Sequence, residues 1–289
     1  MIIEDNIQVD LTPKYNTILG TPELVNTEIV FRGKGNILVA EDNVRLHNCK
    51  IDFKGDNACV YLSSNQKHIY HLALDVWRET TFFFGKDSYF NGVLHAIASE
   101  RQNIIIGNKQ VFSFDVWLRT ADPHLIYDCE TKERLNASKS ILIGDHTWIG
   151  QRAFILKGSV VGSGSVLAAG AVLAGKKMQS NTVYAGNPAK VVKTGIFFTG
   201  ASVHNYTRKQ TKQSQSCESD EFIYHPGERL DTSKLFKSLT KAKTAEERLE
   251  LLQTEVVENP RAGRFYIPPK SNPSFQKRMR RVLQKLRDG

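Results

Sequence analysis

The stretch from residue 143 to residue 178 reads, in blocks of six, IGDHTW, IGQRAF, ILKGSV, VGSGSV, LAAGAV and LAGKKM. Every block begins with an aliphatic residue, and glycine, alanine or serine fills many of the other positions. A period of six differs from the alternation of an ordinary strand and from the period of an amphipathic helix. It predicts a short flat strand and a tight corner in every block, so that three blocks make one triangular coil. Each leading aliphatic would point into the resulting prism and stack on its counterpart one coil away, while the small residues let the chain bend.

Weaker echoes of the same spacing lie upstream. Two runs of residues six apart carry apolar side chains, namely Phe84 and Phe90, and Ile106, Phe112 and Leu118. Val39 and Ile51 are twelve apart, with the non-aliphatic Arg45 between them. We therefore expect the prism to begin near residue 30 with irregular coils.

The repeat is interrupted over residues 117–140, WLRTADPHLIYDCETKERLNASKS, which are polar and include a histidine. An insertion into a solenoid must leave it as a loop, and such loops often carry function. From Asp231 the pattern turns helical, with Thr244 and Glu247 spaced as a capping box and an apolar face at Leu249, Leu252, Val256 and Val257. The predicted organisation is an N-terminal segment (1–30), the prism (31–200) with its protruding loop (117–140), a linker (201–230) and a basic helical region (231–289).

Composition limits the class of protein. The 289 residues are 40% hydrophobic and 24% charged, which excludes full disorder. No apolar run approaches the length needed to cross a bilayer, and the acidic N-terminus does not resemble a signal peptide, so we expect a cytoplasmic protein. The cysteines are scattered without a CxxC pair, and the histidines lack ligand spacing, so we expect no metal and no disulfide framework. The four cysteines are Cys49, Cys59, Cys129 and Cys217.

The net charge of +9 is concentrated near the C-terminus, where residues 205–289 hold 18 basic and 11 acidic residues. The nearly neutral remainder argues against nucleic-acid binding. The last segment, 275–287, places an apolar stripe and six basic residues on one predicted helix. Two interpretations remain open: the stripe packs on the rest of the protein with its bases solvated, or the bases hold an anionic partner. That partner would be the acceptor polymer or the inner face of the cytoplasmic membrane.

The six-residue repeat, the histidine-bearing loop and the segment AGNPAK (185–190) resemble the left-handed β-helix acyltransferases with hexapeptide repeats. Residues 120–150, TADPHLIYDCETKERLNASKSILIGDHTWIG, are similar to bacterial capsule and surface-polysaccharide O-acetyltransferases, including those that act on sialic-acid capsules. The resemblance is strong over residues 117–193 and absent after about residue 205. It implies a left-handed parallel β-helix, acetyl transfer from acetyl-CoA to a polysaccharide hydroxyl, no metal, and a homotrimer with active sites between adjacent prisms.

The resemblance also implies the site. His124 lies where family members have their catalytic histidine, and ester formation needs a base near neutral pH. Asp122 would either orient that ring and help bind the acceptor, or simply form an Asp-Pro turn. Trp148 would line the acetyl and acceptor pocket, or pack between subunits. The backbone N–H of Gln151 would face the thioester carbonyl and stabilise the oxyanion.

The remaining implied contacts are to CoA. Ala168 and Ala169 match small residues against which pantetheine lies, although tight corner sterics explain them equally well. Lys190 and Lys193 match basic positions near the CoA phosphates, and Lys176 either adds to that patch or lies in a solvated turn. Two further hypotheses remain: an acetyltransferase for a small sugar or amino sugar, and a non-catalytic scaffold. A covalent route through Cys129 is less favoured, because the family transfers acetyl directly.

Overall fold

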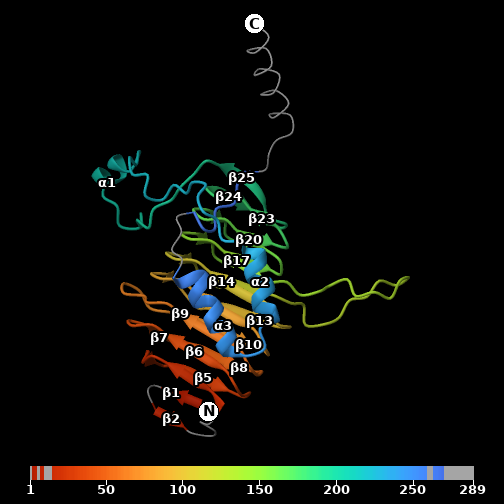
Figure 1. The fold of residues 1–289 in the computed structure, drawn as a ribbon. Helices are drawn as coiled ribbons and strands as arrows, with labels where there is room; N and C mark the ends of the chain where they lie inside the picture. Colours follow the sequence, from red (N-terminus) through yellow and green to blue (C-terminus); the bar gives the residue numbers. More distant parts are fainter. Residues whose placement is uncertain (1, 5–6, 10–14, 259–262, 270–289) are drawn as a thin grey trace.

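The computed structural model describes residues 2–4, 7–9, 15–258 and 263–269 and forms a triangular prism of stacked coils (Figure 1). Three sheets form its sides, which we call faces A, B and C. Between the two ends of the prism, consecutive strands along the chain move from one face to the next, and strands one coil apart pair in parallel. The predicted parallel β-solenoid is therefore confirmed.

Nine described strands make up face A, and its first two, β1 and β2, form an antiparallel hairpin at the N-terminal end. The strands are β2 (Ile7–Val9), β1 (Ile2–Glu4), β5 (Glu28–Phe31), β8 (Lys50–Phe53), β10 (Leu72–Val76), β13 (Leu94–Ala98), β16 (Trp117–Arg119), β19 (Phe154–Leu156) and β22 (Val172–Leu173).

Face B follows face A along each coil. Its strands are β3 (Thr17–Leu19), β6 (Ile37–Ala40), β9 (Cys59–Leu62), β11 (Thr81–Phe84), β14 (Asn103–Ile106), β17 (Ile141–Ile143), β20 (Val160–Val161) and β23 (Lys177–Met178). Parallel pairing thus begins at β3, upstream of the residue 31 at which the sequence placed the start of the prism.

Face C completes each coil and ends in an antiparallel strand, β25. Its strands are β12 (Tyr89–Phe90), β15 (Val111–Phe112), β18 (Trp148–Ile149), β21 (Val166–Leu167), β24 (Thr182–Ala185) and β25 (Lys190–Thr194). A separate parallel pair, β4 (Glu23–Val25) with β7 (Arg45–His47), lies in the first coils.

The hexads fold as their period predicts. The leading aliphatic side chains of all six blocks are fully buried in the prism, and they are Ile143, Ile149, Ile155, Val161, Leu167 and Leu173. Partners on neighbouring coils are 18 positions apart here, as in Ile149 and Leu167. In the preceding coils they are 22 apart, as in Phe84 and Ile106. The longer corners of those coils explain why the period of six fades upstream.

Val39 departs from the expected pattern. Ile51 points into the prism, but Val39 belongs to a second apolar cluster on the outside of face B. In β6 the inward side chains are Leu38 and Ala40, because side chains alternate along a strand. Its neighbour Ile37 is buried with Val39, since a helical layer covers this face.

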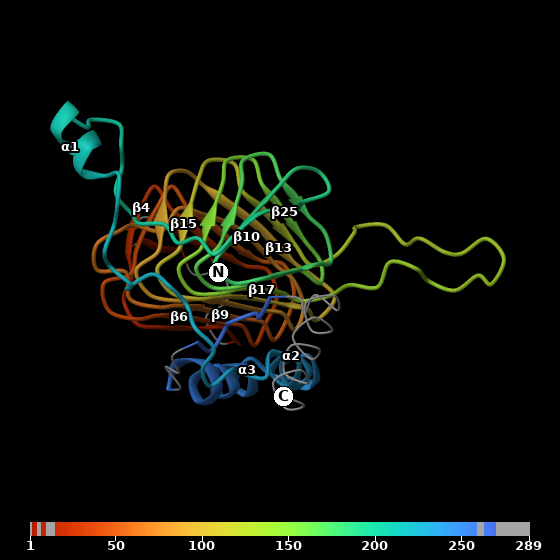
Figure 2. The same ribbon diagram turned by 90° about the horizontal axis from the view of Figure 1, so that it is seen from above.

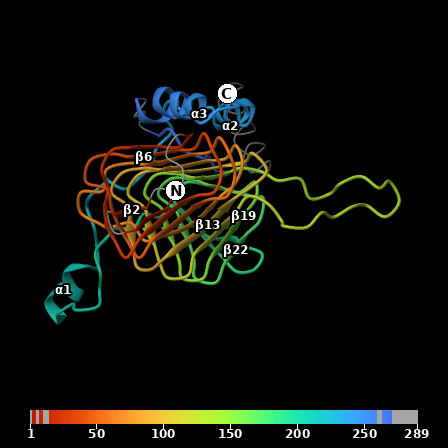
Figure 3. The ribbon, with the colours of Figure 1, turned by 90° about the horizontal axis from the view of Figure 1, so that it is seen from below.

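That layer consists of α2 (Thr232–Lys241), α3 (Ala245–Leu252) and the π-helical turn η2 (Gln253–Val257), which lie along face B (Figures 2 and 3). Thr244 caps α3 as predicted by accepting a hydrogen bond from Glu247 N (3.3 Å), whereas the Glu247 carboxylate accepts from Lys243 N (2.8 Å). Leu252 and Val256 are fully buried against the face, which confirms the predicted apolar side of this segment.

Arg248 fastens the helices to the prism. Its side chain is fully buried, and it donates to the carbonyl oxygen of Asn57 (3.0 Å) on the prism. It also donates to the carbonyl oxygens of Leu239 and Ala242 at the end of α2. The linker contains a short helix, α1 (Arg208–Gln213), which stands away from the prism (Figure 2). The basic helix predicted over 275–287 lies outside the described residues.

Candidate active site

The inserted loop leaves the prism after β16 and returns at β17, at the edge between faces A and B, and projects far from the body (Figure 2). Its two arms pair with each other, since Leu135 N donates to Ile126 O (2.8 Å) and Asp128 N to Glu133 O (2.9 Å). His124 lies on the outgoing arm and is exposed. The histidine is therefore carried by an ordered, protruding arm.

Ion pairs fix the base of this arm to the coils on either side of it. Arg134 donates two hydrogen bonds to the Glu100 carboxylate, at 2.5 and 2.9 Å. Together with a hydrogen bond from Ser138, they lower the pKa of Glu100 to about 2. On the opposite side, Lys157 Nζ lies 2.5 Å from Asp122 Oδ2 and lowers the pKa of that carboxyl. Both carboxylates therefore remain ionised well below neutral pH.

Asp122 is thus engaged with Lys157 and with the side-chain amide of Asn136 (3.1 Å). Within the described part of the chain, no hydrogen bond joins its carboxylate to the His124 ring. Asn136 also donates to the backbone oxygen of His124 (2.7 Å). Asn136 therefore connects Asp122 to the backbone of His124. The role of Asp122 toward the ring and the acceptor stays a prediction.

Trp148 lies on face C, away from the edge at which the loop emerges. Its side chain is 42% exposed, and its indole Nε1 donates to Ser113 Oγ (3.2 Å) on the previous coil. The ring of Phe198, from the segment that follows β25, lies with its centroid 6.1 Å from that of Trp148. Trp148 therefore presents a fixed, half-open aromatic surface on face C.

Gln151, Ala168 and Ala169 lie at one edge of the prism, between faces C and A. Gly170 N donates to Gln151 O (2.7 Å), so the two corners stack directly. Gly150 lies against the backbone of Ala169, because a Cβ added to it would be 2.4 Å from Ala169 N. Among the described residues the Gln151 N–H donates no hydrogen bond.

The predicted lysines gather at the C-terminal end of the prism. A hollow of about 950 Å³ there is lined by Lys176 and Lys190, together with Lys177. Lys193 lies on the same strand, β25, but outside that lining. Because the pairing register over β18, β21, β24 and β25 runs Trp148–Val166–Val183–Lys193, Trp148 and Lys193 are roughly 14 Å apart across the sheet.

The structure thus brings the predicted residues together in two groups. Trp148, the Gln151–Ala169 corner and the lysine-lined hollow follow one another along face C and its edge. His124 belongs to the protruding loop, which leaves the prism at the edge between faces A and B (Figure 2).

Comparison with known proteins adds the family. Residues 140–175 match the model for the bacterial transferase hexapeptide (six repeats). A polysialic acid O-acetyltransferase of Neisseria meningitidis is 33% identical over 193 residues, which are 66% of this chain and 88% of that protein. The match to the hexapeptide model and the extent of the similarity to the Neisseria protein decide the family of this chain. The chain belongs to the hexapeptide-repeat O-acetyltransferases.

Two further similarities concern this O-acetyltransferase. A polysialic acid O-acetyltransferase of Escherichia coli is 43% identical over 102 residues, which are 35% of this chain and 33% of that protein. The crystal structure of the polySia specific acetyltransferase NeuO is 28% identical and superposes with a TM-score of 0.60, over 69% of this chain and 93% of that chain.

Several contacts of the acetyltransferase had no signal in the sequence. Phe198 and Ser113 meet Trp148, and Asn136 meets the His124 segment, across separations of 12 to 50 residues. The residues of each pair are far apart in the sequence, so their contact becomes visible only in the three-dimensional structure. The part of the chain that the structure describes contains no cluster of His, Cys, Asp and Glu that would hold a metal ion, and no helix long and apolar enough to cross a membrane.

His146 has a packing role in the acetyltransferase. It is 4% exposed and lies between the rings of Phe198 and Phe222, whose centroids are 4.1 and 4.2 Å away. Its Nε2 is 2.9 Å from the carbonyl oxygen of Phe198, so Nε2 carries the proton. Burial lowers the pKa of His146 and favours the neutral ring. The stack holds the segment after β25 against face C beside Trp148.

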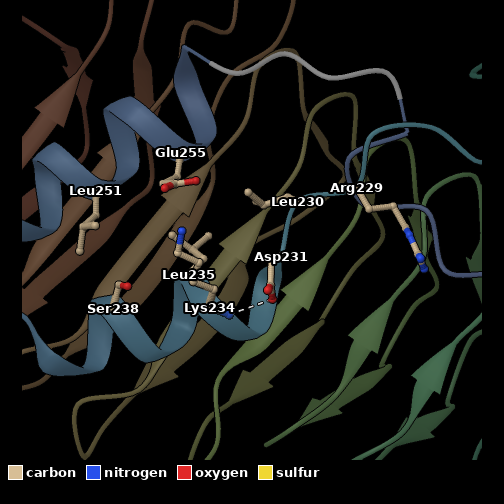
Figure 4. A pocket seen from close by; sticks show the side chains of 8 residues that line it. All are labelled: Arg229, Leu230, Asp231, Lys234, Leu235, Ser238, Leu251 and Glu255. Atoms are coloured by element: carbon tan, nitrogen blue, oxygen red, sulfur yellow. Dashed lines mark hydrogen bonds between the residues drawn. The ribbon is translucent and has the colours of Figure 1, made fainter.

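A smaller cavity of about 310 Å³ lies in the helical layer of the acetyltransferase, between α2 and the segment of α3 and η2 (Figure 4). Its lining mixes charges and leucines, and the N-cap bond from Lys234 N to Asp231 Oδ1 (3.0 Å) runs along it. None of the predicted site residues lines it. We therefore place the candidate active site on face C and the loop.

Proposed function

We propose that the protein transfers acetyl from acetyl-CoA to a hydroxyl of a capsular polysaccharide of the polysialic acid type. The observation that carries this proposal is the match to the Neisseria polysialic acid O-acetyltransferase over 88% of its length. The geometry of face C supports it, because an unpaired N–H at Gln151 and a lysine-lined hollow are what a thioester carbonyl and a phosphate-rich carrier need.

In the proposed reaction His124 accepts the proton of the acceptor hydroxyl as its oxygen attacks the acetyl carbon. The Gln151 N–H donates to the carbonyl oxygen while negative charge develops there. As the new C–O bond forms and the C–S bond breaks, His124 returns the proton to the departing sulfur. Trp148 packs against the acetyl group or acceptor, Ala168 and Ala169 border the pantetheine, and Lys176, Lys190 and Lys193 hold the CoA phosphates.

A second copy of the chain completes the proposed site. His124 and Trp148 project from different sides of one prism, so the loop of one copy has to reach face C of another. Four apolar side chains of the loop are more than half exposed and suit such a contact: Leu125, Ile126, Tyr127 and Leu135. Face B of each copy is already covered by its own helices. We propose a homotrimer, in which each loop reaches one neighbour.

The shared site has a direct test. His124→Ala and Trp148→Ala proteins, each inactive alone, are mixed, dissociated and reassembled. If each site takes His124 from one copy and Trp148 from the next, about a quarter of the sites in the mixture are intact. Activity that stays at the level of the separate variants would overturn the shared site.

The acceptor is tested separately. Release of the CoA thiol is measured with acetyl-CoA and polysialic acid, free sialic acid, neutral sugars or amino sugars. We expect the polyanionic polymer to be the best acceptor and the product to carry an ester. A product acetylated on nitrogen, or a preference for neutral sugars, would overturn the proposed substrate class.

A further inference from the structure

The Asn136 side chain fills the space between the two arms of the loop at its base. It is 5% exposed, and both its amide nitrogen and its amide oxygen form hydrogen bonds. Nδ2 donates to the backbone oxygen of His124 (2.7 Å) and to Asp122 Oδ2 (3.1 Å), while Oδ1 accepts from Ile126 N (3.0 Å). One side chain therefore holds the backbone at His124 and Ile126 and the carboxylate of Asp122.

Asn136 is itself bound to the prism; we call its side chain, with its bonds to Asp122, His124 and Ile126, the brace. Lys157 Nζ donates to the backbone oxygen of Asn136 (3.0 Å) as well as to the Asp122 carboxylate. Arg134, two residues before Asn136, is held by Glu100 on the coil below. Fixed coils on both sides of the insertion thus determine where Asn136 lies, and through it the position of the His124 backbone.

The chemistry of this place selects an amide. The Asn136 amide uses two N–H donors and an acceptor oxygen at once. Only asparagine and glutamine carry two such donors and an acceptor oxygen on one planar group. An aspartate would keep the bond from Ile126 N but would lose both donors and place a second carboxylate against Asp122. An alanine would leave the His124 oxygen and the Ile126 N–H without this partner.

We propose that Asn136 is a positioning residue for His124, which sets the distance from the imidazole to the acceptor hydroxyl. This inference rests on the proposed function, in which His124 is the base. A displacement of about 1 Å in such a geometry lowers the rate by about 10². The loss would be in kcat, with the KM for acetyl-CoA unchanged, because the predicted CoA contacts lie on face C.

The test is a double-mutant cycle with a matched control in the same loop. Asn136→Ala is expected to lower kcat by about 10- to 100-fold. In a His124→Ala background it is expected to have no further effect, since the group it positions is gone. Thr131→Ala, which removes a bond from Glu133 N (3.3 Å) and a side-chain hydrogen bond to Asp128 at the loop tip, should retain wild-type kcat. A kcat for Asn136→Ala within threefold of wild type, or an equal loss in the His124→Ala background, would overturn the proposal.

A second measurement does not depend on activity. Amide hydrogen exchange at residues 122–126 should speed up in Asn136→Ala, while exchange in the hexad strands stays unchanged. Unchanged exchange at 122–126 would show that Asn136 does not hold the segment. If the wild-type protein transfers no acetyl group while exchange responds as expected, the proposed function fails and the brace stands.

Discussion

Replacing Gly150 with alanine perturbs the predicted acetyl site through the backbone alone. Gly150 lies outside the left-handed region, so an alanine can adopt its backbone conformation. Its Cβ, however, would be 2.4 Å from Ala169 N and 2.7 Å from the carbonyl carbon of Ala168, whereas ordinary contacts begin at 3.4 Å. The two corners must therefore separate by about 1 Å, which shifts the Gln151 N–H relative to Ala168 and Ala169. Such a displacement should lower kcat/KM by about 10² and destabilise the protein by about 1–3 kcal/mol.

The assay is the initial rate of CoA thiol release at varied acetyl-CoA, with the melting temperature measured in parallel. Two glycines serve as controls. Gly170→Ala changes the corner of the next coil, where no atom lies within 4 Å of the new Cβ. Its backbone cost is about 1–2 kcal/mol, because φ at Gly170 is +67°. Gly85→Ala introduces a similar clash, 2.5 Å from the carbonyl carbon of Gly107, two coils away from Trp148. Both should stay active while folded. A folded Gly150→Ala protein within threefold of wild-type kcat/KM would refute the placement of the acetyl site at this corner.

Three further predictions follow from the same geometry. Lys176→Glu and Lys190→Glu should each raise the KM for acetyl-CoA and leave the KM for the acceptor nearly unchanged; the reverse pattern would place the lysines at the polymer. Burial lowers the pKa of His146 below the ordinary histidine value of about 6.5, so near and below that pH the unfolded chain binds more protons than the folded protein. The free energy of unfolding should therefore fall as the pH is lowered through about 6.5. His146→Phe should weaken this dependence in denaturant titrations at several pH values, and an unchanged slope would contradict it. Arg248→Met removes the donor from three carbonyl oxygens and should destabilise the helical layer by about 3 kcal/mol, detected as faster proteolysis within 232–257; unchanged protection would contradict its anchoring role.

The hexads could be predicted because their information is local. Each leading aliphatic, such as Ile149 or Leu167, faces inward because of its place in its own block of six residues. The spacing of Phe84 and Phe90 was informative even in the longer coils, since both rings lie in the prism. The pattern misled at Val39, because an outward position becomes apolar when a distant helix covers it. A residue pattern within the strand cannot distinguish burial by the prism from burial by the helices.

The candidate site was only partly accessible from the sequence. The resemblance placed His124 on a loop and Trp148 in a hexad, but it gave no sign of which side chains hold them. Asn136 lies 12 residues from His124, and Ser113 lies 35 residues from Trp148. These contacts depend on how coils stack and how the loop closes on itself. Asp122 illustrates the same limit, since its carboxylate is bound by Lys157, a residue of the next coil.

The most direct test of acetyl transfer by His124 uses acetyl-CoA labelled with ¹³C at the carbonyl carbon and polysialic acid as the acceptor. The product polymer is examined by NMR after incubation with the wild-type protein or with His124→Ala. We expect a labelled ester on a sugar hydroxyl with the wild-type protein and a signal lower by about 10² to 10⁴ with the variant, as for a lost general base. A polymer without label after incubation with the wild-type protein, or equal labelling by a folded His124→Ala protein, would contradict the account.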